Sequence, residues 1–290
     1  MDYRAGSQDE GRCLLSVLRQ SMRLSASTVQ HAKWHQGIHV NGKEAHTNAI
    51  IHAQDLICVS LPAPKQAYVP KPYFLPLRLA YEDEWLMVVD KPAPLACQSG
   101  RNHPDDSLEN AMFAMLGCPE SFVYRPVNRL DKGTSGLMVV AKDAHVQQLL
   151  QSTLHSDAFI RRYQAITCGV PPKSEDTICS AIGKADGASI RREVRSDGKQ
   201  AVTYYHVETV CGDRALVGLR LGTGRTHQIR VHLASIGCPI FGDFLYGTES
   251  GLLPGRFALH ASELLLKHPI TGQDLCCVSP LPDELRQLLC

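Results

Sequence analysis

The chain has 290 residues, of which 44% are hydrophobic and 20% are charged. That length is enough for about two domains, and the composition excludes wholesale disorder. The net charge of +1 excludes a polycation, so any nucleic-acid binding must come from basic residues gathered on one face. No apolar stretch is long enough to span a bilayer, and the first ten residues do not form a secretory signal, so we expect a cytoplasmic protein.

The eleven cysteines are scattered and include no Cys-x-x-Cys pair. This usage is typical of buried free thiols in a reducing cytosol. His227 and His232 are five residues apart, which suits neither a helical pair nor a usual zinc spacing. Gly222-x-Gly224 lacks the third glycine of a dinucleotide-binding fingerprint. We therefore expect neither a metal nor a nucleotide cofactor.

The first part of the chain predicts a small α/β domain over residues 12–61. The residues before it are polar, and we expect them to be frayed. Apolar residues at helical spacing predict a helix over Leu14–Leu24, and Ser25 is a candidate N-cap for a second helix. Strand signals follow at Ile38–Val40 and Leu56–Leu61, with a hairpin turn signal at Asn41-Gly42.

Residues 62–76 (PAPKQAYVPKPYFLP) predict an extended linker, because proline fixes its own φ and cannot donate to a sheet. Residues 77–290 then predict a second domain. Its strands outnumber its helices and do not alternate with them, which favours an α+β fold with a mixed, mostly antiparallel sheet and flanking helices. The strand candidates are Leu86–Val89, Leu137–Ala141, Tyr163–Thr167, Val202–Glu208 and Ala215–Leu221, and the helix candidates are Leu108–Leu116, Asp143–Leu154 and Thr226–Ile236.

Asp131 is the first candidate for chemistry. It lies in the run Asn128–Leu137 (NRLDKGTSGL), between Val127 and a predicted strand. Thr134 and Ser135 can bond the local backbone and hold this loop, which leaves the carboxylate free to face a cleft. A solvated aspartate that bonds its own turn fits the same pattern.

Gly222–His232 (GTGRTHQIRVH) is a second candidate segment. Arg225 stands at a predicted helix start, where a basic side chain is unfavourable beside the helix dipole unless an anion is near. On that helix His227 and Arg230 lie three residues apart on one face. An exposed basic helix face is the alternative interpretation.

Two further segments combine basic and aromatic residues. Ile160–Ala165 (IRRYQA) places Arg162 before Tyr163, whose ring can stack on a base and whose phenol can exchange a proton. A core tyrosine with a bonded hydroxyl is an equally good interpretation. Ile190–Lys199 (IRREVRSDGK) suits either phosphate contacts or a solvated hairpin tip, and its candidate side chains are Arg191, Arg192 and Lys199.

The run Asn128–Asp131 followed by Thr134–Leu137 resembles the signature of the RluA-type RNA pseudouridine synthases. The resemblance covers about residue 77 to the end of the chain, because further motifs recur in that family's order. They are Lys91-Pro92, Arg162–Ala165, Gly198–Ala201 with Thr203, Gly224–His232, Gly242-Asp243 with Tyr246-Gly247, and Leu259–Ala261. Residues 25–61, which include Gln36–Gly42 (QGIHVNG), more loosely resemble the small αL-type RNA-binding domain often fused to these enzymes.

The resemblance implies an isomerase that converts uridines in RNA to pseudouridine and needs no cofactor or metal. It implies that Asp131 is the catalytic carboxylate and must be ionised, and that Tyr163 stacks on the target base and takes part in proton removal. Arg225 is our candidate for the arginine that pairs with the carboxylate, as a third catalytic residue. Arg129 is expected to help displace the target base from its stack.

The implied partner is RNA, either ribosomal or transfer RNA, and the αL-like domain favours large-subunit ribosomal RNA. We expect a monomer with no obligate protein partner. The expected RNA contacts are Arg129, Arg162, Arg191, Arg192, Lys199, His227 and Arg230.

The sequence also departs from the family. Asn128 stands where relatives usually have a histidine, which affects the loop's packing or its contact with RNA. Two other functions remain open at this point. One is a non-catalytic RNA-binding or assembly factor derived from a synthase. The other is a glycoside hydrolase, although that class normally needs a second catalytic carboxylate.

Overall fold

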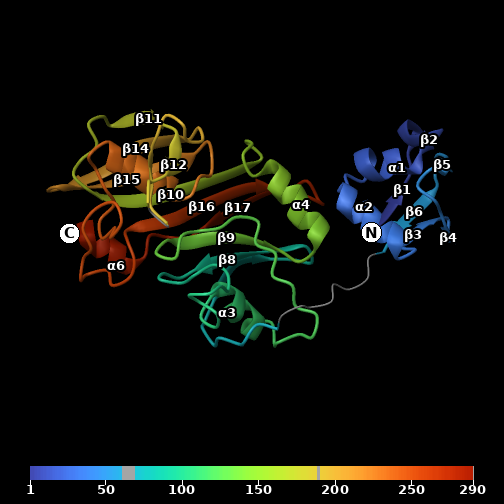
Figure 1. Cartoon of the computed structure of the whole chain (residues 1–290), viewed down its shortest axis with the longest axis horizontal. Coiled ribbons are helices and arrows are strands. Elements are labelled where there is room, and N and C mark those ends of the chain that lie inside the picture. The colour runs from blue at the N-terminus through green and yellow to red at the C-terminus, as the bar shows by residue number, and fades with distance from the viewer. Residues whose placement is uncertain (61–68, 188–189, 290) are drawn as a thin grey trace. The chain divides into compact units, whose positions relative to one another are not determined.

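The computed structural model describes residues 1–60, 69–187 and 190–289. The chain forms two compact units, Met1–Tyr68 and Val69–Cys290 (Figure 1). In the described part of the chain, no helix is both long and apolar enough to cross a membrane. The same residues contain no group of three or more His, Cys, Asp or Glu side chains that could hold a metal ion.

The first unit is built around a four-stranded antiparallel sheet with helical segments beside it. The strands in sheet order are β1 (Asp2–Arg4), β6 (Leu56–Val59), β3 (Ile38–Val40) and β4 (Lys43–Glu44), and β2 (Arg12–Cys13) pairs separately with β5 (Ile50–Ile51). The helical segments are η1 (Ser7–Asp9), α1 (Leu14–Ser16), the π turn η2 (Val17–Ser21) and α2 (Ala26–Trp34). Their apolar side chains form one core with the sheet.

The expected fraying of the first dozen residues is wrong. β1 pairs with β6 along its whole length, and the buried Asp9 accepts hydrogen bonds from Tyr3 Oη and Ser21 Oγ, each at 2.6 Å. This unit therefore starts at Met1 rather than at residue 12. The cap at Ser25 is confirmed, because its hydroxyl accepts from the Thr28 amide at 2.9 Å.

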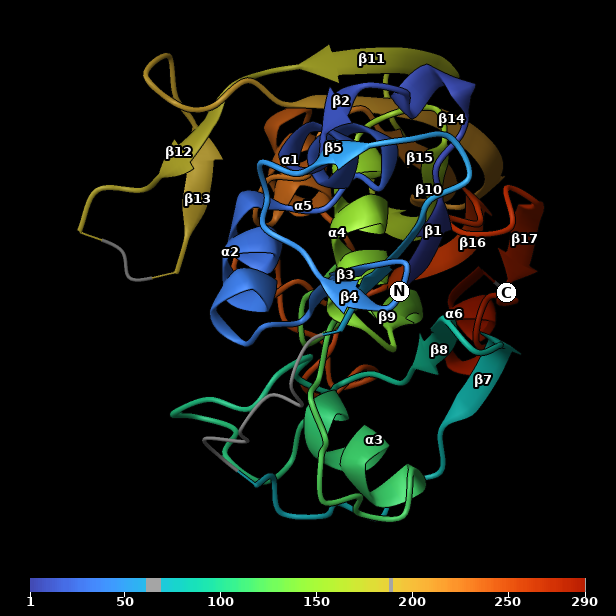
Figure 2. The same ribbon diagram turned by 90° about the vertical axis from the view of Figure 1, so that its right-hand side faces the viewer.

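The second unit contains a nine-stranded sheet that is antiparallel except where β16 meets β9. This confirms the predicted α+β architecture. The sheet order is β11 (Glu175–Cys179), β14 (Val202–Cys211), β15 (Arg214–Leu221), β10 (Phe159–Cys168), β16 (Leu259–Lys267), β9 (Ser135–Ala141), β8 (Leu86–Lys91) and β7 (Arg78–Glu82), and β17 (Asp274–Val278) also pairs with β16. A separate hairpin of β12 (Ile182–Lys184) and β13 (Arg192–Val194) stands out from this sheet (Figure 2).

Helices cover both faces of the sheet, and the alternation of side chains along each strand explains why. On β8, Leu86 and Val88 belong to the cluster formed with α4 (Ala144–Thr153). Met87 and Val89 point the other way and belong to the cluster that includes α3 (Leu108–Met115) and α5 (Gln228–Ser235). Strands buried on both faces read as continuous apolar runs, as β8 and β9 do. The last elements are α6 (Asp283–Arg286) and η3 (Gln287–Leu289).

The predicted linker over residues 62–76 is only partly correct, because its second half packs on the second unit. Residues 61–68 lie outside the described residues. Beyond them the chain docks on α3, since the Asn110 side chain donates to Lys71 O at 2.9 Å and the Tyr73 amide donates to Asn110 O at 3.2 Å. Leu75 also packs against the core, so the second unit begins ahead of residue 77.

Candidate active site

The loop that carries Asp131 is fixed to its surroundings by polar contacts at both ends. Asn128 is buried, and its Oδ1 accepts a hydrogen bond from the Val139 amide of β9 at 2.9 Å. The Thr134 amide donates to Asp131 O at 3.0 Å and closes a turn. The departure at Asn128 therefore has a structural role, because this side chain ties the start of the loop to the sheet.

Lys91 holds the same loop through hydrogen bonds to backbone carbonyls. Its side chain is fully buried, and Nζ donates to Leu95 O at 2.8 Å, Pro92 O at 3.0 Å and Lys132 O at 3.3 Å. Burial lowers the pKa of Lys91 to about 8. A buried ammonium normally requires acceptors, and the three carbonyls provide them. The Lys91-Pro92 motif thus holds the backbone next to Asp131.

Asp131 pairs with an arginine of α5. Arg230 Nη1 lies 3.1 Å from Asp131 Oδ2, while Arg230 Nε and Nη2 bind the two oxygens of Asp243 at 2.7 and 2.8 Å. The Asp243 side chain is fully buried and that of Arg230 is 3% exposed, whereas that of Asp131 is 28% exposed. Burial would lower the pKa of Arg230, but its bonds and charge interactions with Asp243 and Asp131 raise it overall. Asp131, Arg230 and Asp243 thus form an Asp–Arg–Asp clamp. Within it, the Asp131 carboxylate is accessible and lies beside a permanent positive charge.

His227 is the second neighbour of this carboxylate. It caps α5 with a left-handed φ of 58°, its Nδ1 lies 2.7 Å from Tyr246 Oη, and its Nε2 lies 3.9 Å from Asp131 Oδ2. Burial lowers the pKa of His227 despite the nearby charge of Asp131. The imidazole is therefore neutral at neutral pH.

Arg225 does not pair with Asp131, so that part of its predicted catalytic role is wrong. Its Nε donates to Gln200 O at 3.0 Å instead. The helix prediction explains the error, because α5 starts at Gln228 rather than at Thr226 and Arg225 lies on the loop before it. Arg230 occupies the position that we had expected Arg225 to fill.

These groups open onto a cavity of about 890 Å³. A smaller space of about 70 Å³ adjoins it and reaches Arg230 and Leu259. The predicted residues that line the larger cavity are Arg129, Asp131, Tyr163, Arg225 and His227. The structure thus brings together the three segments that the sequence singled out separately.

Tyr163 is buried on β10, and burial raises the pKa of its phenol, an effect that nearby Arg161 partly offsets. Arg161 was missed at the sequence level, although it lines the same cavity. The signal was available, because residues two apart on a strand point to the same face. Arg161 therefore accompanies Tyr163, whereas Arg162 points away.

Residues 85–235 match the family model described as RNA pseudouridylate synthase. The chain belongs to the RNA pseudouridylate synthase family. Over 286 residues it is 35% identical to the uncharacterized RNA pseudouridine synthase YhcT of Bacillus subtilis, covering 97% of this chain and 93% of that protein. It is 38% identical to ribosomal large subunit pseudouridine synthase D of Xylella fastidiosa, over 75% of this chain and 70% of that one.

A solved structure agrees with this assignment. The protein named human RNA pseudouridylate synthase domain containing 1 has a TM-score of 0.59 to this chain at 27% identity, covering 72% of this chain and 86% of that one. The predicted family and reaction class are confirmed, and the protein is an isomerase that acts on RNA.

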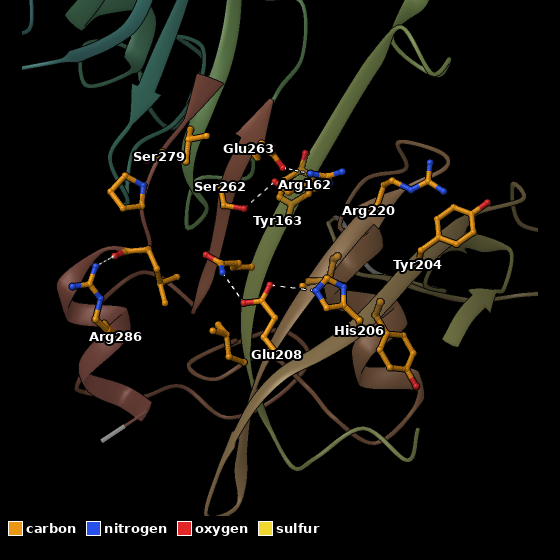
Figure 3. Close-up of a pocket in the computed structure, with 18 of the residues that line it drawn as sticks. Arg162, Tyr163, Tyr204, His206, Glu208, Arg220, Ser262, Glu263, Ser279 and Arg286 are labelled. Carbon is orange, nitrogen blue, oxygen red and sulfur yellow. Dashed lines mark hydrogen bonds and ion pairs between the residues drawn. The ribbon is translucent and has the colours of Figure 1, made fainter. Parts of the chain in front are cut away.

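Arg162 of the synthase does not line the cavity that contains Asp131. It forms an ion pair with Glu263 of β16 and lines a second cavity of about 960 Å³, which Tyr163 also borders (Figure 3). That cavity is lined by the arginines Arg162, Arg220 and Arg286 and by the glutamates Glu175, Glu208 and Glu263, so it does not present a surface of one charge.

The sequence suggested Arg230 as an RNA contact, but its buried guanidinium pairs with Asp131 and Asp243 instead. Three other predicted RNA contacts, Arg191, Arg192 and Lys199, lie on or beside the β12–β13 hairpin. Tyr246 connects this hairpin to the site, since its hydroxyl accepts from the Arg192 amide at 2.9 Å and contacts His227. Arg191 and Lys199 are exposed on the synthase surface nearby.

Proposed function

We propose that this enzyme forms pseudouridine in ribosomal RNA, with large-subunit RNA favoured, and that Asp131 is its catalytic carboxylate. One observation carries the proposal: Asp131 is the accessible member of a buried Asp–Arg–Asp clamp and faces a cavity that also contains Tyr163. The name of the Xylella fastidiosa relative supports the choice of RNA.

Asp131 has the properties that this reaction requires. Cleavage of the bond between ribose C1′ and uracil N1 leaves positive character on the ribose, which a carboxylate can stabilise or bond covalently. The uracil keeps the electron pair, turns in the cavity and forms a new bond from C5 to C1′. C5 then loses its proton and N1 gains one, so the atoms balance and no other reactant is consumed.

Tyr163 is assigned to hold the base and to assist the final proton transfer. Tyr163 lines the cavity, and an aromatic face suits stacking on a pyrimidine. Because burial raises its pKa, the phenol is protonated at neutral pH. To accept the proton from C5, the phenol must therefore first donate its own proton to another group.

Basic side chains at the cavity mouth are assigned to the RNA backbone. Arg129 is exposed and Arg225 makes one backbone contact, so both are available to phosphates. Arg129 is also assigned to fill the gap left by a displaced base. Arg191, Arg192 and Lys199 extend this basic surface onto the hairpin. We further propose that the enzyme works as a monomer in the cytoplasm.

Pseudouridine mapping across total RNA tests the proposed function. Cells without this protein should lack one or a few pseudouridines in large-subunit ribosomal RNA, and the wild-type chain should restore them. Loss of sites only in transfer RNA would overturn the choice of substrate. An unchanged map, together with salt-sensitive RNA binding by the purified chain, would favour the non-catalytic RNA-binding factor instead.

A further inference from the structure

His227 and Tyr246 connect the β12–β13 hairpin to the carboxylate of Asp131. The Arg192 amide of β13 donates to Tyr246 Oη at 2.9 Å, and Tyr246 Oη lies 2.7 Å from His227 Nδ1. The other ring nitrogen, His227 Nε2, lies 3.9 Å from Asp131 Oδ2. These four groups form one continuous chain, and the positions of its protons follow from its first member.

The Arg192 amide sets the direction of hydrogen bonding along this chain. A backbone N–H can only donate, so the Tyr246 oxygen accepts from it. Among the described residues, the only acceptor within reach of the Tyr246 hydroxyl proton is His227 Nδ1. Burial raises the pKa of Tyr246, so the phenol keeps this proton at neutral pH. His227 Nδ1 therefore accepts from Tyr246 and carries no proton of its own.

His227 consequently carries its proton on Nε2. Burial lowers the pKa of His227, so the imidazole is neutral at neutral pH and has only one N–H group. The orientation of the ring is fixed by the same contact. A flipped ring would bring Cδ2 rather than Nδ1 to the hydroxyl oxygen, and carbon and oxygen normally stay about 3.3 Å or more apart. The nitrogen that bears the proton is thus the one nearest Asp131.

The Tyr246 hydroxyl is itself held in place. Its ring packs edge-on against the His227 ring, with centroids 5.7 Å apart, and the Arg230 guanidinium lies 5.0 Å from the Tyr246 centroid. Tyr246 therefore contacts the same arginine that pairs with Asp131. A hydroxyl fixed in this way can select one tautomer of its neighbour, because it cannot turn to accept a proton from Nδ1 without leaving its own proton unpaired.

The tautomer decides the sign of the interaction between the imidazole and Asp131. With the proton on Nε2, the positive end of an N–H dipole lies beside the carboxylate, whereas with the proton on Nδ1 a lone pair would lie there. At 3.9 Å the interaction is electrostatic rather than a full hydrogen bond. The His227 side chain is 13% exposed, and the low local dielectric strengthens such an interaction.

We propose that Tyr246 and His227 are positioning residues for Asp131: the Tyr246 hydroxyl holds the proton of His227 on Nε2, where it stabilises the ionised carboxylate. Their role rests on the proposed function of Asp131 and adds to it the two residues that set the field on its free side. It requires no contact between either residue and RNA. Because the chain starts at Arg192, it also connects the seating of the hairpin to the reacting carboxylate.

Nitrogen-15 NMR of the full-length protein with labelled histidine tests the tautomer in the absence of RNA. The shifts of the two ring nitrogens report which of them carries the proton, and His227→Asn identifies the signals by their loss. Wild type at neutral pH should carry the proton on Nε2, and Tyr246→Phe should show a mixture of the two tautomers. A proton on Nδ1 in the wild type, or an unchanged His227 signal in Tyr246→Phe, would overturn the proposal.

Turnover by Tyr246→Phe tests the effect on the carboxylate. We expect kcat to fall about twofold to tenfold, the range set by the net contribution of one hydrogen bond, while KM and the melting temperature stay near those of the wild type. A rise in KM with unchanged kcat would make Tyr246 a support for the hairpin alone and would contradict the proposal.

Tyr205→Phe is the matched control. It removes the hydroxyl of another buried tyrosine, which lines the second cavity rather than the one that contains Asp131. We expect unchanged kcat, KM and His227 signals. Equal losses of kcat in the two variants would mean a general effect of a missing hydroxyl rather than an action on Asp131.

Two substitutions of His227 separate its N–H group from its backbone conformation. Asparagine tolerates the left-handed φ of 58°, but its amide is too short to reach Asp131. Glutamine is long enough to place an amide N–H near the position of Nε2. We expect kcat to fall in His227→Asn and to be partly restored in His227→Gln, at comparable melting temperatures.

Equal kcat values in the two His227 variants would exclude a role for the N–H group. Wild-type turnover is measured in the same assay, and its absence would count against the proposed function of the enzyme. The tautomer is measured without turnover, so its result stands whether or not the enzyme proves to act on the chosen RNA.

Discussion

Arg230 joins Asp131 to Asp243, with one guanidinium nitrogen 3.1 Å from Asp131 and two others within 2.8 Å of Asp243. The arginine also lies over the Phe257 ring, 4.1 Å from its centroid. Two carboxylates and one aromatic ring therefore fix the guanidinium before any substrate binds. The geometry places a carboxylate of defined orientation at the cavity, which is how an enzyme preorganises a nucleophile.

Arg230→Ala should destabilise the enzyme. The change leaves the fully buried Asp243 carboxylate without its partner, and breaking a buried pair from one side costs about 3–5 kcal/mol. Urea unfolding of the two proteins measures the difference. A loss below about 1 kcal/mol, the size typical of exposed pairs, would mean that the Arg230–Asp243 pair does not contribute to stability as a buried pair.

Arg230→Lys should fold better than Arg230→Ala but should still be inactive. Lysine keeps the charge but cannot bind both oxygens of Asp243 while also reaching Asp131. Turnover on large-subunit RNA transcribed without modifications gives the readout, with the melting temperature as the control for folding. Activity near that of wild type would show that charge alone is sufficient.

Arg225→Ala should weaken RNA binding more than it slows turnover. Arg225 contacts the Gln200 carbonyl rather than Asp131, so its remaining donors are available to phosphate. The plot of log affinity against log salt should lose about 0.7–0.9 in slope, the amount expected for one phosphate contact. A large fall in kcat at saturating RNA with an unchanged slope would instead restore a direct role beside the carboxylate.

Tyr163→Phe should bind RNA normally and lose most of its turnover. Phenylalanine keeps the stacking face but removes the hydroxyl that we assign to proton transfer. Because burial raises the phenol pKa, wild-type activity should show no rise from tyrosine ionisation between neutral pH and pH 9. Full activity of Tyr163→Phe would limit Tyr163 to stacking. A rise in wild-type activity toward pH 9 that is absent from Tyr163→Phe would mean that the phenolate is the active form.

The enzyme should lose stability as the pH falls below about 6.5. Burial lowers the pKa of His232 and of His260 below their ordinary value of 6.5, so the folded state binds fewer protons than the unfolded chain in this range. The histidine contribution is complete above pH 6.5 and declines below it. Urea midpoints at pH 7.5 and 5.5 measure the slope, and His232→Gln should reduce it. An identical slope in that variant would exclude His232 as a contributor.

Local sequence pattern predicted the elements well where the signals are local. The predicted Ser25 cap forms, and the predicted helices Leu108–Leu116 and Asp143–Leu154 agree closely with α3 and α4, because these signals depend on residues a few positions apart. The three-residue spacing of His227 and Arg230 was also informative, since both side chains lie near Asp131. They do so through a helix cap and a first turn rather than along one helix face.

Pairings between distant segments could not be obtained in this way. The partner of Asp131 lies 99 residues further along the chain, and pattern alone could not choose between Arg225 and Arg230. The start of α5 decided the matter, because the left-handed His227 shifts it by two residues. Similarly, strand β1 needed β6 from the other end of its unit, which is why the first residues looked frayed in isolation.

The central claim is that Asp131 carries the chemistry, and Asp131→Asn tests it most directly. Asparagine has nearly the same shape but no charge, and it lies on the accessible side of the clamp. The measurement is pseudouridine formed in unmodified large-subunit ribosomal RNA by purified wild-type and variant enzyme, with melting temperature and RNA affinity as controls. We predict that the variant folds, binds RNA and forms no pseudouridine, and product formation at the wild-type rate would contradict the account.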